Sequence, residues 1–207
     1  MTTTPRIFCI GRNYAAHIEE LGHVDDGECL VFMKPASCIT PVGSPILLPR
    51  NRGEVHFEAE MTVRLGRDAE GGLDPGDALA HIDAIGLGLD LTLCDAQNAL
   101  RARGAPWELC KAFDGAAPLG PWQPFVGQEL QALRFTCTVN GEGRQHAHTA
   151  QMLFPVTRLL HILAQTWALR AGDIVYTGTP AGVGALQPGD TITLSGASLG
   201  EASWTCR

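Results

Sequence analysis

The chain has 207 residues, 45% of them hydrophobic and 18% charged, so it is long enough for one domain with its own core. It contains no apolar run of about 18 residues, which argues against a membrane-spanning helix. A formal charge of -7 without a basic block argues against nucleic acid as a partner. The start, MTTTPRIFCIGRNY, lacks the basic and apolar regions of a secretion signal. We therefore expect a cytoplasmic protein with no membrane partner.

The seven cysteines are odd in number and scattered, with no C-x-x-C pair and no zinc-type spacing. They are interpreted as buried thiols rather than as disulfides or metal ligands.

The 24 glycines and 13 prolines are spread along the chain. Short apolar alternations lie between turn signals such as DPGD, NGEGR, RAGD and QPGD. This pattern is typical of a mainly β protein with a few helices, an α+β class. The units AGDIVYTG and PGDTITLSG resemble each other and predict two neighbouring strands. His146 and His148 follow the turn NGEGR and are assigned to the flank of a hairpin.

Residues 12–22, RNYAAHIEELG, predict the first helix, with Asn13 as its cap and Gly22 at its exit. One apolar stripe of this helix consists of Tyr14, Ile18 and Leu21. His17 and Glu20 then share a flank, where they form either an exposed surface pair or part of a site. Glycines on both sides suggest that this helix, within an N-terminal segment of residues 1–45, acts as a mobile cover.

Residues 55–66, VHFEAEMTVRLG, predict a strand that places Glu58 and Glu60 on the same face. Their Cβ atoms would lie roughly 6 to 7 Å apart, close enough for both carboxylates to reach one cation. The alternative is the solvated outer face of an antiparallel strand.

Residues 85–97, IGLGLDLTLCDAQ, contain a very apolar alternation with one acid, Asp90. Burying this carboxylate is costly unless it is paired or binds a metal, although an aspartate bonded to a turn is the alternative. Gly86 and Gly88 on its face leave room for a ligand or another backbone. Three hard oxygen donors, from Glu58, Glu60 and Asp90, would suit Mg²⁺ or Mn²⁺, with Ca²⁺ as a substitute. A non-catalytic module holding a structural Ca²⁺ is the remaining alternative.

Two further helices are predicted. In DAQNALRARGAP, Asp95 is the expected N-cap, and Gly104 and Pro106 end the helix. The segment FPVTRLLHILAQTWALRAG has the apolar spacing of a core helix that begins at Pro155.

In this order, E-x-E, LDLTLCDAQ, PWELCKAFDGAAPLGPW and VYTGTPAGVG resemble the motifs of the fumarylacetoacetate hydrolase family. The resemblance is greatest to the short members that act on acylpyruvates and oxaloacetate. It implies a mixed β-roll or barrel-like fold, one catalytic domain over residues 1–207 and a homodimer. It also implies one divalent ion held by Glu58, Glu60 and Asp90.

The resemblance also assigns roles to single residues. It implies that Lys111 is catalytic, that His17 and Glu20 form the dyad of the acylpyruvases, and that Lys34 in FMKP is a basic substrate-binding position. Gly178 and Thr179 of the TGTP loop would bind substrate.

One position departs from the family. Cys94 stands where many relatives have arginine, so Arg101 or Arg103 would have to supply that contact. The candidates for the distal end of the pocket are Arg12, Arg101, Arg103 and Trp107.

The expected activity is hydrolysis of the carbon–carbon bond of acylpyruvates, such as fumarylpyruvate or acetylpyruvate, to pyruvate and a carboxylic acid. His17, held by Glu20, would activate the attacking water, and Lys111 would add positive charge beside the substrate's oxygens. Thr179 and nearby amides would bind the carboxylate of this small 2-oxo acid. Oxaloacetate decarboxylation and keto–enol tautomerisation are the alternatives, because both use the same enolate.

Overall fold

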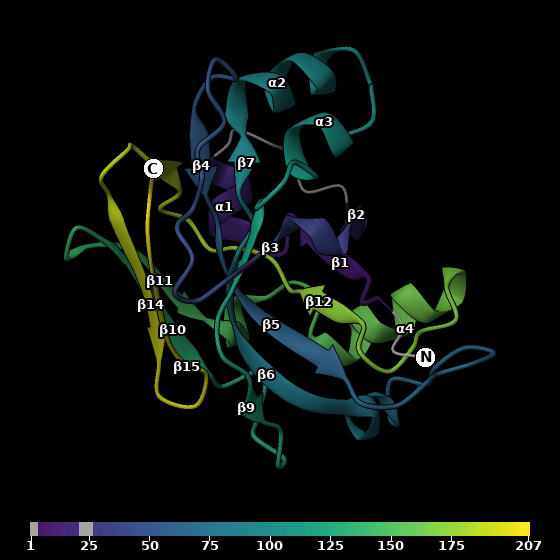
Figure 1. Cartoon of the computed structure of the whole chain (residues 1–207). Helices are drawn as coiled ribbons and strands as arrows, with labels where there is room; N and C mark the ends of the chain where they lie inside the picture. Colours follow the sequence, from purple (N-terminus) through teal and green to yellow (C-terminus); the bar gives the residue numbers. More distant parts are fainter. Residues whose placement is uncertain (1–3, 21–26) are drawn as a thin grey trace.

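The computed structural model describes residues 4–20 and 27–207. Its chain forms three β-sheets with helices at their edges, which confirms the mainly β fold with a few helices (Figure 1). The α-helices are α1 (Ala15–Glu20), α2 (Cys94–Ala102), α3 (Glu108–Lys111) and α4 (Val156–Thr166). Three short 3₁₀ turns are η1 (Ala36–Cys38), η2 (Ala78–His81) and η3 (Thr149–Gln151).

The largest sheet is mixed and curls into a half-barrel (Figure 1). Its strands are β1 (Ile7–Gly11), β2 (Leu30–Lys34), β3 (Ile39–Pro41), β5 (Ala59–Leu65), β6 (Ile82–Leu89), β8 (Ala117–Leu119), β9 (Gln123–Pro124) and β12 (Ile174–Tyr176). They lie in the order β2-β1-β12-β5-β6-β8-β3, and β9 pairs with β6. The β1–β12 and β3–β8 pairs are parallel and the others are antiparallel, as in the mixed roll that the family resemblance predicts.

Two smaller sheets complete the fold. The second sheet has the order β11-β10-β14-β15, with β10 (Arg134–Val139), β11 (Glu142–His148), β14 (Thr191–Gly196) and β15 (Gly200–Thr205). The third has the order β13-β4-β7, with β4 (Val55–Phe57), β7 (Thr92–Leu93) and β13 (Gly184–Ala185). The prediction of two neighbouring strands near the end is wrong, because β12 belongs to the large sheet and β14 to the second.

The predicted hairpin after β10 is confirmed. Asn140 and Gly141 connect β10 to β11 with φ angles of 53° and 81°. Positive φ at both positions gives the turn a twist that matches its strands, and Asn-Gly tolerates it best. His146 and His148 accordingly lie on β11.

The predicted core helix is also confirmed. Helix α4 begins directly after Pro155 and buries one stripe, Val156, Leu159, Leu160, Leu163 and Ala164. Beyond its end, the ring of Trp167 lies 5.2 Å from that of Phe8 on β1. The helix is thereby held against the large sheet.

Both predicted helix caps are wrong. The Asn13 side chain bonds to the backbone of Thr177 and Phe154 instead of α1. Asp95 lies inside the first turn of α2, where its carboxylate accepts from the Glu54 amide at 3.3 Å. In both cases a long-range backbone partner replaces the local one. The predicted end of the first helix at Leu21 and Gly22 lies outside the described residues.

The seven cysteines are free thiols, as predicted, and five of them are buried. Burial raises their pKa values, to about 11 for Cys110. Neutral buried thiols are poor nucleophiles, so the chemistry must come from other groups.

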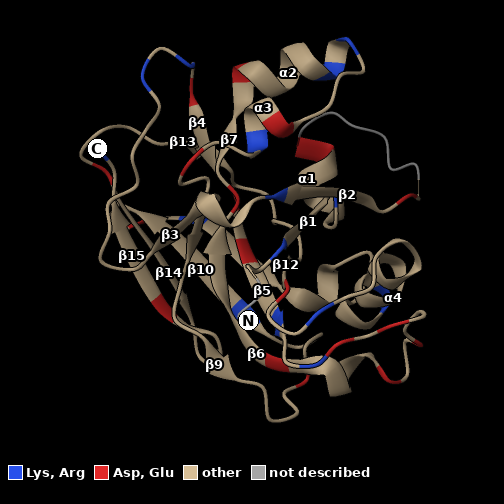
Figure 2. Ribbon diagram, turned by 45° about the vertical axis from the view of Figure 1, so that its right-hand side comes forward, with Lys and Arg blue, Asp and Glu red and all other residues tan. Residues whose placement is uncertain are grey.

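Lysine and arginine residues are distributed over several elements rather than gathered on one (Figure 2). Among the described residues, no helix is both long and apolar enough to cross a membrane.

Candidate metal centre and active site

Glu58 and Asp90 each lie where the chain passes from one sheet to another. Glu58 separates β4 from β5, and Asp90 follows β6 shortly before β7, so the predicted continuous strand over residues 55–66 is interrupted. The two breaks are adjacent, because the Asp90 amide donates to the Glu58 carbonyl oxygen at 2.8 Å. Glu60 lies opposite Gly88 in the antiparallel pair of β5 and β6, one position beyond the Ala59–Leu89 pair. The fold therefore brings three acids from two segments to one place.

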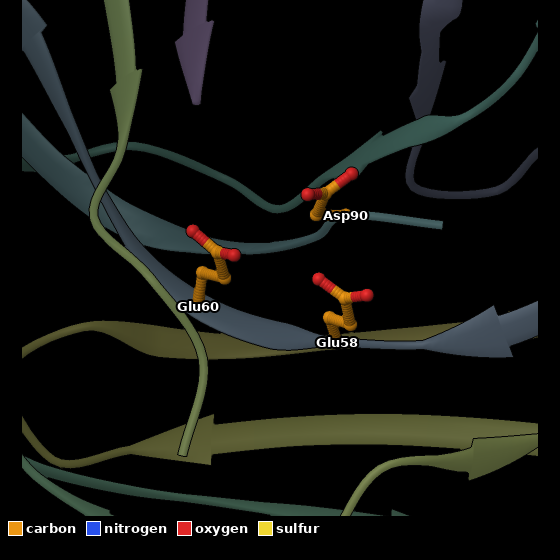
Figure 3. Close-up of side chains that lie close together, drawn as sticks. All are labelled: Glu58, Glu60 and Asp90. Carbon is orange, nitrogen blue, oxygen red and sulfur yellow. The ribbon is translucent and has the colours of Figure 1, made fainter. Parts of the chain in front are cut away.

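The three carboxylates converge. One oxygen from each of Glu58, Glu60 and Asp90 can be chosen so that all lie within 4.8 Å of one another (Figure 3). Glu60 and Asp90 are both only 1% exposed, and the Glu58 side chain is 15% exposed. The alternative of a solvated outer strand face is therefore wrong.

The predicted room beside Gly86 and Gly88 is filled by the protein itself. A Cβ on Gly88 would lie 2.7 Å from the Tyr176 ring, and one on Gly86 would lie 3.3 Å from Thr62 and Trp122. These glycines admit side chains of neighbouring elements and, at Gly86, the Pro121 carbonyl oxygen at 3.3 Å, so they make space for packing and for another backbone rather than for a ligand.

Lys111 lies between two of the acids. Its ammonium group donates to Glu58 Oε2 at 2.9 Å and to Asp90 Oδ2 at 2.8 Å. Burial lowers the pKa of Lys111, but the charges of Asp90 and Glu58 outweigh burial and raise it above its ordinary value. Lys111 therefore stays protonated at neutral pH and acts as a fixed positive charge rather than as a base.

Lys34 lies behind Asp90 and is not among the residues that line the pocket containing Glu58, Glu60 and Lys111. Its ammonium group is 2.8 Å from Asp90 Oδ1, and it donates to the carbonyl oxygens of Leu91, at 3.1 Å, and Lys111. Although burial raises the pKa of Asp90, the two lysines outweigh it, and the net shift is downward. The structure thus places Lys34 as a support for Asp90.

The donor set fits a divalent cation. Three carboxylates face two ammonium groups, which leaves one net negative charge in a buried cluster. Burial and the charges of Asp90 and Glu58 raise the pKa of Glu60 well above its ordinary value. A cation would remove that penalty, and hard carboxylate oxygens are the ligands that Mg²⁺ and Mn²⁺ prefer.

His17 and Glu20 form the predicted pair, and it is a built arrangement rather than a loose surface pair. His17 Nδ1 lies 3.1 Å from Glu20 Oε2, and the other oxygen of Glu20 accepts from the Gly182 amide at 3.0 Å. His17 is only 6% exposed. With Nδ1 facing a carboxylate, the favoured tautomer carries the proton there and leaves Nε2 as an acceptor.

One pocket, with about 450 Å³ of empty space that includes its solvent-open mouth, is lined by Glu58, Glu60, Lys111 and His17. Its lining comes from β1, α1, β2, α2, α3, the Glu58–Glu60 segment and the loop at Thr179, and α1, α2 and α3 lie at the same end of the molecule (Figure 1). The lining residues are Ile10, Gly11, Arg12, His17, Leu30, Phe32, Glu58, Glu60, Gln97, Arg101, Trp107, Lys111 and Thr179.

Most predicted distal residues line this cavity. Arg12, Arg101 and Trp107 do so, whereas Arg103 is exposed and donates to the Ala99 carbonyl at 3.2 Å. Gln97 was missed by the sequence reasoning. Its position one turn after Cys94 on α2 was the available signal.

Gly178 and Thr179 lie beside the acids, but the Gly178 amide and the Thr179 hydroxyl already donate hydrogen bonds within the protein. The Gly178 amide donates to Glu60 Oε2 at 2.6 Å, so it supports a carboxylate. The Thr179 hydroxyl donates its proton to the Ala59 carbonyl at 2.9 Å, so this hydroxyl is not available as a donor to substrate.

The family profile described as "Fumarylacetoacetate (FAA) hydrolase C-terminal" matches residues 6–206. The chain belongs to the fumarylacetoacetate hydrolase family. It is therefore a metal-dependent enzyme of that family, and its acidic triad is suited to the ion.

Curated members of the family are similar over most of the chain. Oxaloacetate tautomerase YcgM of Escherichia coli strain K12 is 39% identical over 199 residues, which cover 94% of this chain and 90% of that protein. The mitochondrial oxaloacetate tautomerase FAHD1 of Homo sapiens is 34% identical, over 90% of this chain and 84% of its own length.

Solved members share the fold. A protein from Oleispira antarctica matches with a TM-score of 0.94 and 36% identity, over 99% of this chain and 94% of its own. Fumarylpyruvate hydrolase from Pseudomonas aeruginosa, in complex with Mn²⁺ and pyruvate, matches with a TM-score of 0.91 and 36% identity, over 98% and 89%.

Proposed function

We propose that the protein interconverts the keto and enol forms of a small 2-oxo dicarboxylic acid of the oxaloacetate class. The observation that carries this proposal is the position of His17, which lines the same cavity as Glu58, Glu60 and Lys111 and has its Nδ1 held by Glu20. The similarity to oxaloacetate tautomerases supports the same reaction. The sequence alone favoured hydrolysis, and the similarity to these relatives is our reason for proposing tautomerisation first.

The reaction moves one proton between C3 and the 2-oxo oxygen and needs no other reactant. A divalent ion held by Glu58, Glu60 and Asp90 would act as a Lewis acid that favours negative charge on the substrate's 2-oxo oxygen. His17 Nε2 accepts the C3 proton and then returns it to the 2-oxo oxygen, which completes the enol, while Glu20 fixes the ring and stabilises the imidazolium. Lys111 stays protonated and adds positive charge beside the acids.

A second carboxylate on the substrate would account for the two arginines that line the cavity. Arg12 and Arg101 line the cavity together with Gln97 and Trp107. Guanidinium groups bind carboxylates with two parallel hydrogen bonds, so they favour a dicarboxylate over a monocarboxylate. Arg101 is thus the proposed replacement for the arginine that many relatives have at Cys94.

Hydrolysis of acylpyruvates is the second candidate. The similarity to fumarylpyruvate hydrolase favours it, and His17 could direct its Nε2 at a water molecule instead of a C–H bond. Decarboxylation of oxaloacetate uses the same groups without the water.

The test compares three substrates on the Mn²⁺-loaded protein: enol oxaloacetate, fumarylpyruvate and acetylpyruvate. Loss of the enol absorbance without release of pyruvate or CO₂ is expected for oxaloacetate, with slower turnover of the two acylpyruvates. His17→Gln should lower the tautomerisation rate at least about 100-fold, as expected for loss of a general base.

His146→Gln is the matched control, since His146 is exposed on β11, outside the cavity lining. A His17→Gln protein with the wild-type tautomerisation rate would refute the proposed role. Faster hydrolysis of fumarylpyruvate than tautomerisation of oxaloacetate would make the second candidate the function.

A further inference from the structure

Gln145 reaches the active site from a different sheet. It lies on β11 of the second sheet and is 1% exposed. Its Oε1 accepts from the Ala59 amide at 2.9 Å, and its Nε2 donates to Thr179 Oγ1 at 2.8 Å and to the Pro180 carbonyl at 2.7 Å. The oxygen and the nitrogen of one buried side-chain amide therefore both form hydrogen bonds to segments of the active site.

The first partner lies within the acidic segment. Ala59 stands between Glu58 and Glu60, at the break where β4 ends and β5 begins. An unpaired amide at such a break would be costly to bury, so Gln145 supplies the acceptor that the interrupted strand lacks. The backbone direction on either side of Ala59 sets where both glutamates point.

The other two partners lie in the loop of residues 177–183, between β12 and β13. The same loop donates from Gly178 to Glu60 and from Gly182 to Glu20. It therefore contacts both an acid of the triad and the carboxylate that holds His17.

We propose that Gln145 is a positioning residue that holds the 177–183 loop against the Glu58–Glu60 segment. It sets the spacing of the triad and, through Gly182, the seat of the His17–Glu20 pair. The inference rests on the triad being the metal centre, but it is independent of which substrate the enzyme uses.

Only a side chain with an acceptor and a donor on one short planar group fits these partners. The Thr179 hydroxyl already donates to Ala59, so it needs a donor from Gln145, and Pro180 offers only an acceptor. A glutamate at this position would place a carboxylate oxygen against the Pro180 carbonyl. A methionine would leave the Ala59 amide without an acceptor and Pro180 without its donor.

The experiment measures Mn²⁺ affinity by calorimetry on metal-free wild type, Gln145→Met and Gln145→Asn, together with the melting temperature of each protein. Gln145→Asn keeps the amide but is one methylene shorter, so it should preserve folding while losing either the hydrogen bond to Ala59 or those to Thr179 and Pro180. We expect both variants to bind Mn²⁺ about tenfold or more weakly, the usual effect of removing a group that orients metal ligands. Hydrogen exchange at the Gly178 and Gly182 amides should quicken in both.

Gln131→Met is the matched control. Gln131 is half-buried beside the same sheet and donates to the Thr149 carbonyl at 3.0 Å, but it touches neither the loop nor the acids. It should lower the melting temperature while leaving Mn²⁺ affinity unchanged. A merely structural role for Gln145 would give that same pattern.

Folded Gln145 variants that bind Mn²⁺ within twofold of wild type would overturn the proposal. If neither variant folds, wild-type hydrogen exchange decides. The Ala59 and Gly178 amides should then open together, and a Gly178 amide that opens far more readily than Ala59 would overturn the coupling. A wild-type protein that binds no Mn²⁺ would contradict the metal centre as well, whereas inactivity on oxaloacetate with tight Mn²⁺ binding would contradict only the proposed function.

Discussion

Glu60 has the least favourable environment of the three acids. Burial, together with the negative charges of Asp90 and Glu58, raises its pKa well above the ordinary value. A carboxyl whose pKa is raised in the folded state contributes stability that is fully present below its unfolded-state pKa. That contribution is lost as the pH rises through the raised pKa.

The metal-free protein should therefore lose stability as the pH rises above the ordinary range of a glutamate pKa, and Glu60→Gln should flatten this loss. The measurement is the melting temperature of both proteins in chelator at pH values within and above that range. Asp90 works in the opposite sense, because its lowered pKa contributes stability that disappears as the pH falls through it. A wild-type profile no steeper than that of Glu60→Gln above the ordinary range of a glutamate pKa would show that the pKa of Glu60 is not raised in the folded protein.

The sequence predicted the three acids of the site but not the residues that hold them in place. Strand alternation alone placed Glu58 and Glu60 on one face, and the costly burial of Asp90 pointed to a charged partner. Gln145 carries no such local signal. Its role depends on a contact between β11 and a loop more than thirty residues later, which a pattern along one strand does not encode.

The 177–183 loop contacts both the metal-binding acids, through Glu60, and the His17–Glu20 pair, through Glu20. Gly182 has φ of +99°, and a Cβ there would lie 2.1 Å from the Arg144 carbonyl oxygen. Gly189 has nearly the same φ, +96°, but nothing lies within 4 Å of its Cβ position. A side chain at Gly182 would therefore meet both a left-handed backbone and a steric clash, whereas one at Gly189 would meet the left-handed backbone alone.

Gly182→Ala should displace the loop, release Glu20 and lower turnover at least about tenfold, since misplacing a catalytic group even slightly is costly. Gly189→Ala should cost only about 1–2 kcal/mol of unfolding free energy for its left-handed backbone and leave turnover unchanged. Denaturant unfolding and initial rates measure both effects. Equal behaviour of the two variants would show that the Gly182 contact is irrelevant to the site.

Element types followed from sequence more readily than element partners. The apolar spacing of α4 and the Asn140–Gly141 turn are local properties, and both predictions are confirmed. The interruptions at Glu58 and Asp90 and the separation of β12 from β14 are long-range properties. They arise because three sheets share the chain, so each strand takes the partner that buries it best.

Binding of the ion should stabilise the whole folded chain against unfolding. Mn²⁺ at 100 times its dissociation constant adds about 2.7 kcal/mol to the free energy of unfolding. For a chain of this size the melting temperature should rise by roughly 5 to 10 °C. Glu60→Gln should show little of this rise, and a full rise in that variant would place the ion elsewhere.

The family resemblance predicts a homodimer, which we propose for this chain. Val42 and Leu47, near β3 at the end of the large sheet, are 48% and 64% exposed and are candidates for contact with a partner. Sedimentation should give about twice the 22.1 kDa chain mass. A single species of the chain mass at micromolar concentration would contradict the dimer.

We propose that Glu58, Glu60 and Asp90 together hold one divalent ion. Anomalous diffraction from crystals grown with Mn²⁺ would locate that ion. We predict a single strong anomalous peak within bonding distance of an oxygen from each of the three residues, about 2.0–2.3 Å for hard oxygen ligands. A map in which the three carboxylates are well ordered and no anomalous peak lies among them would contradict the account.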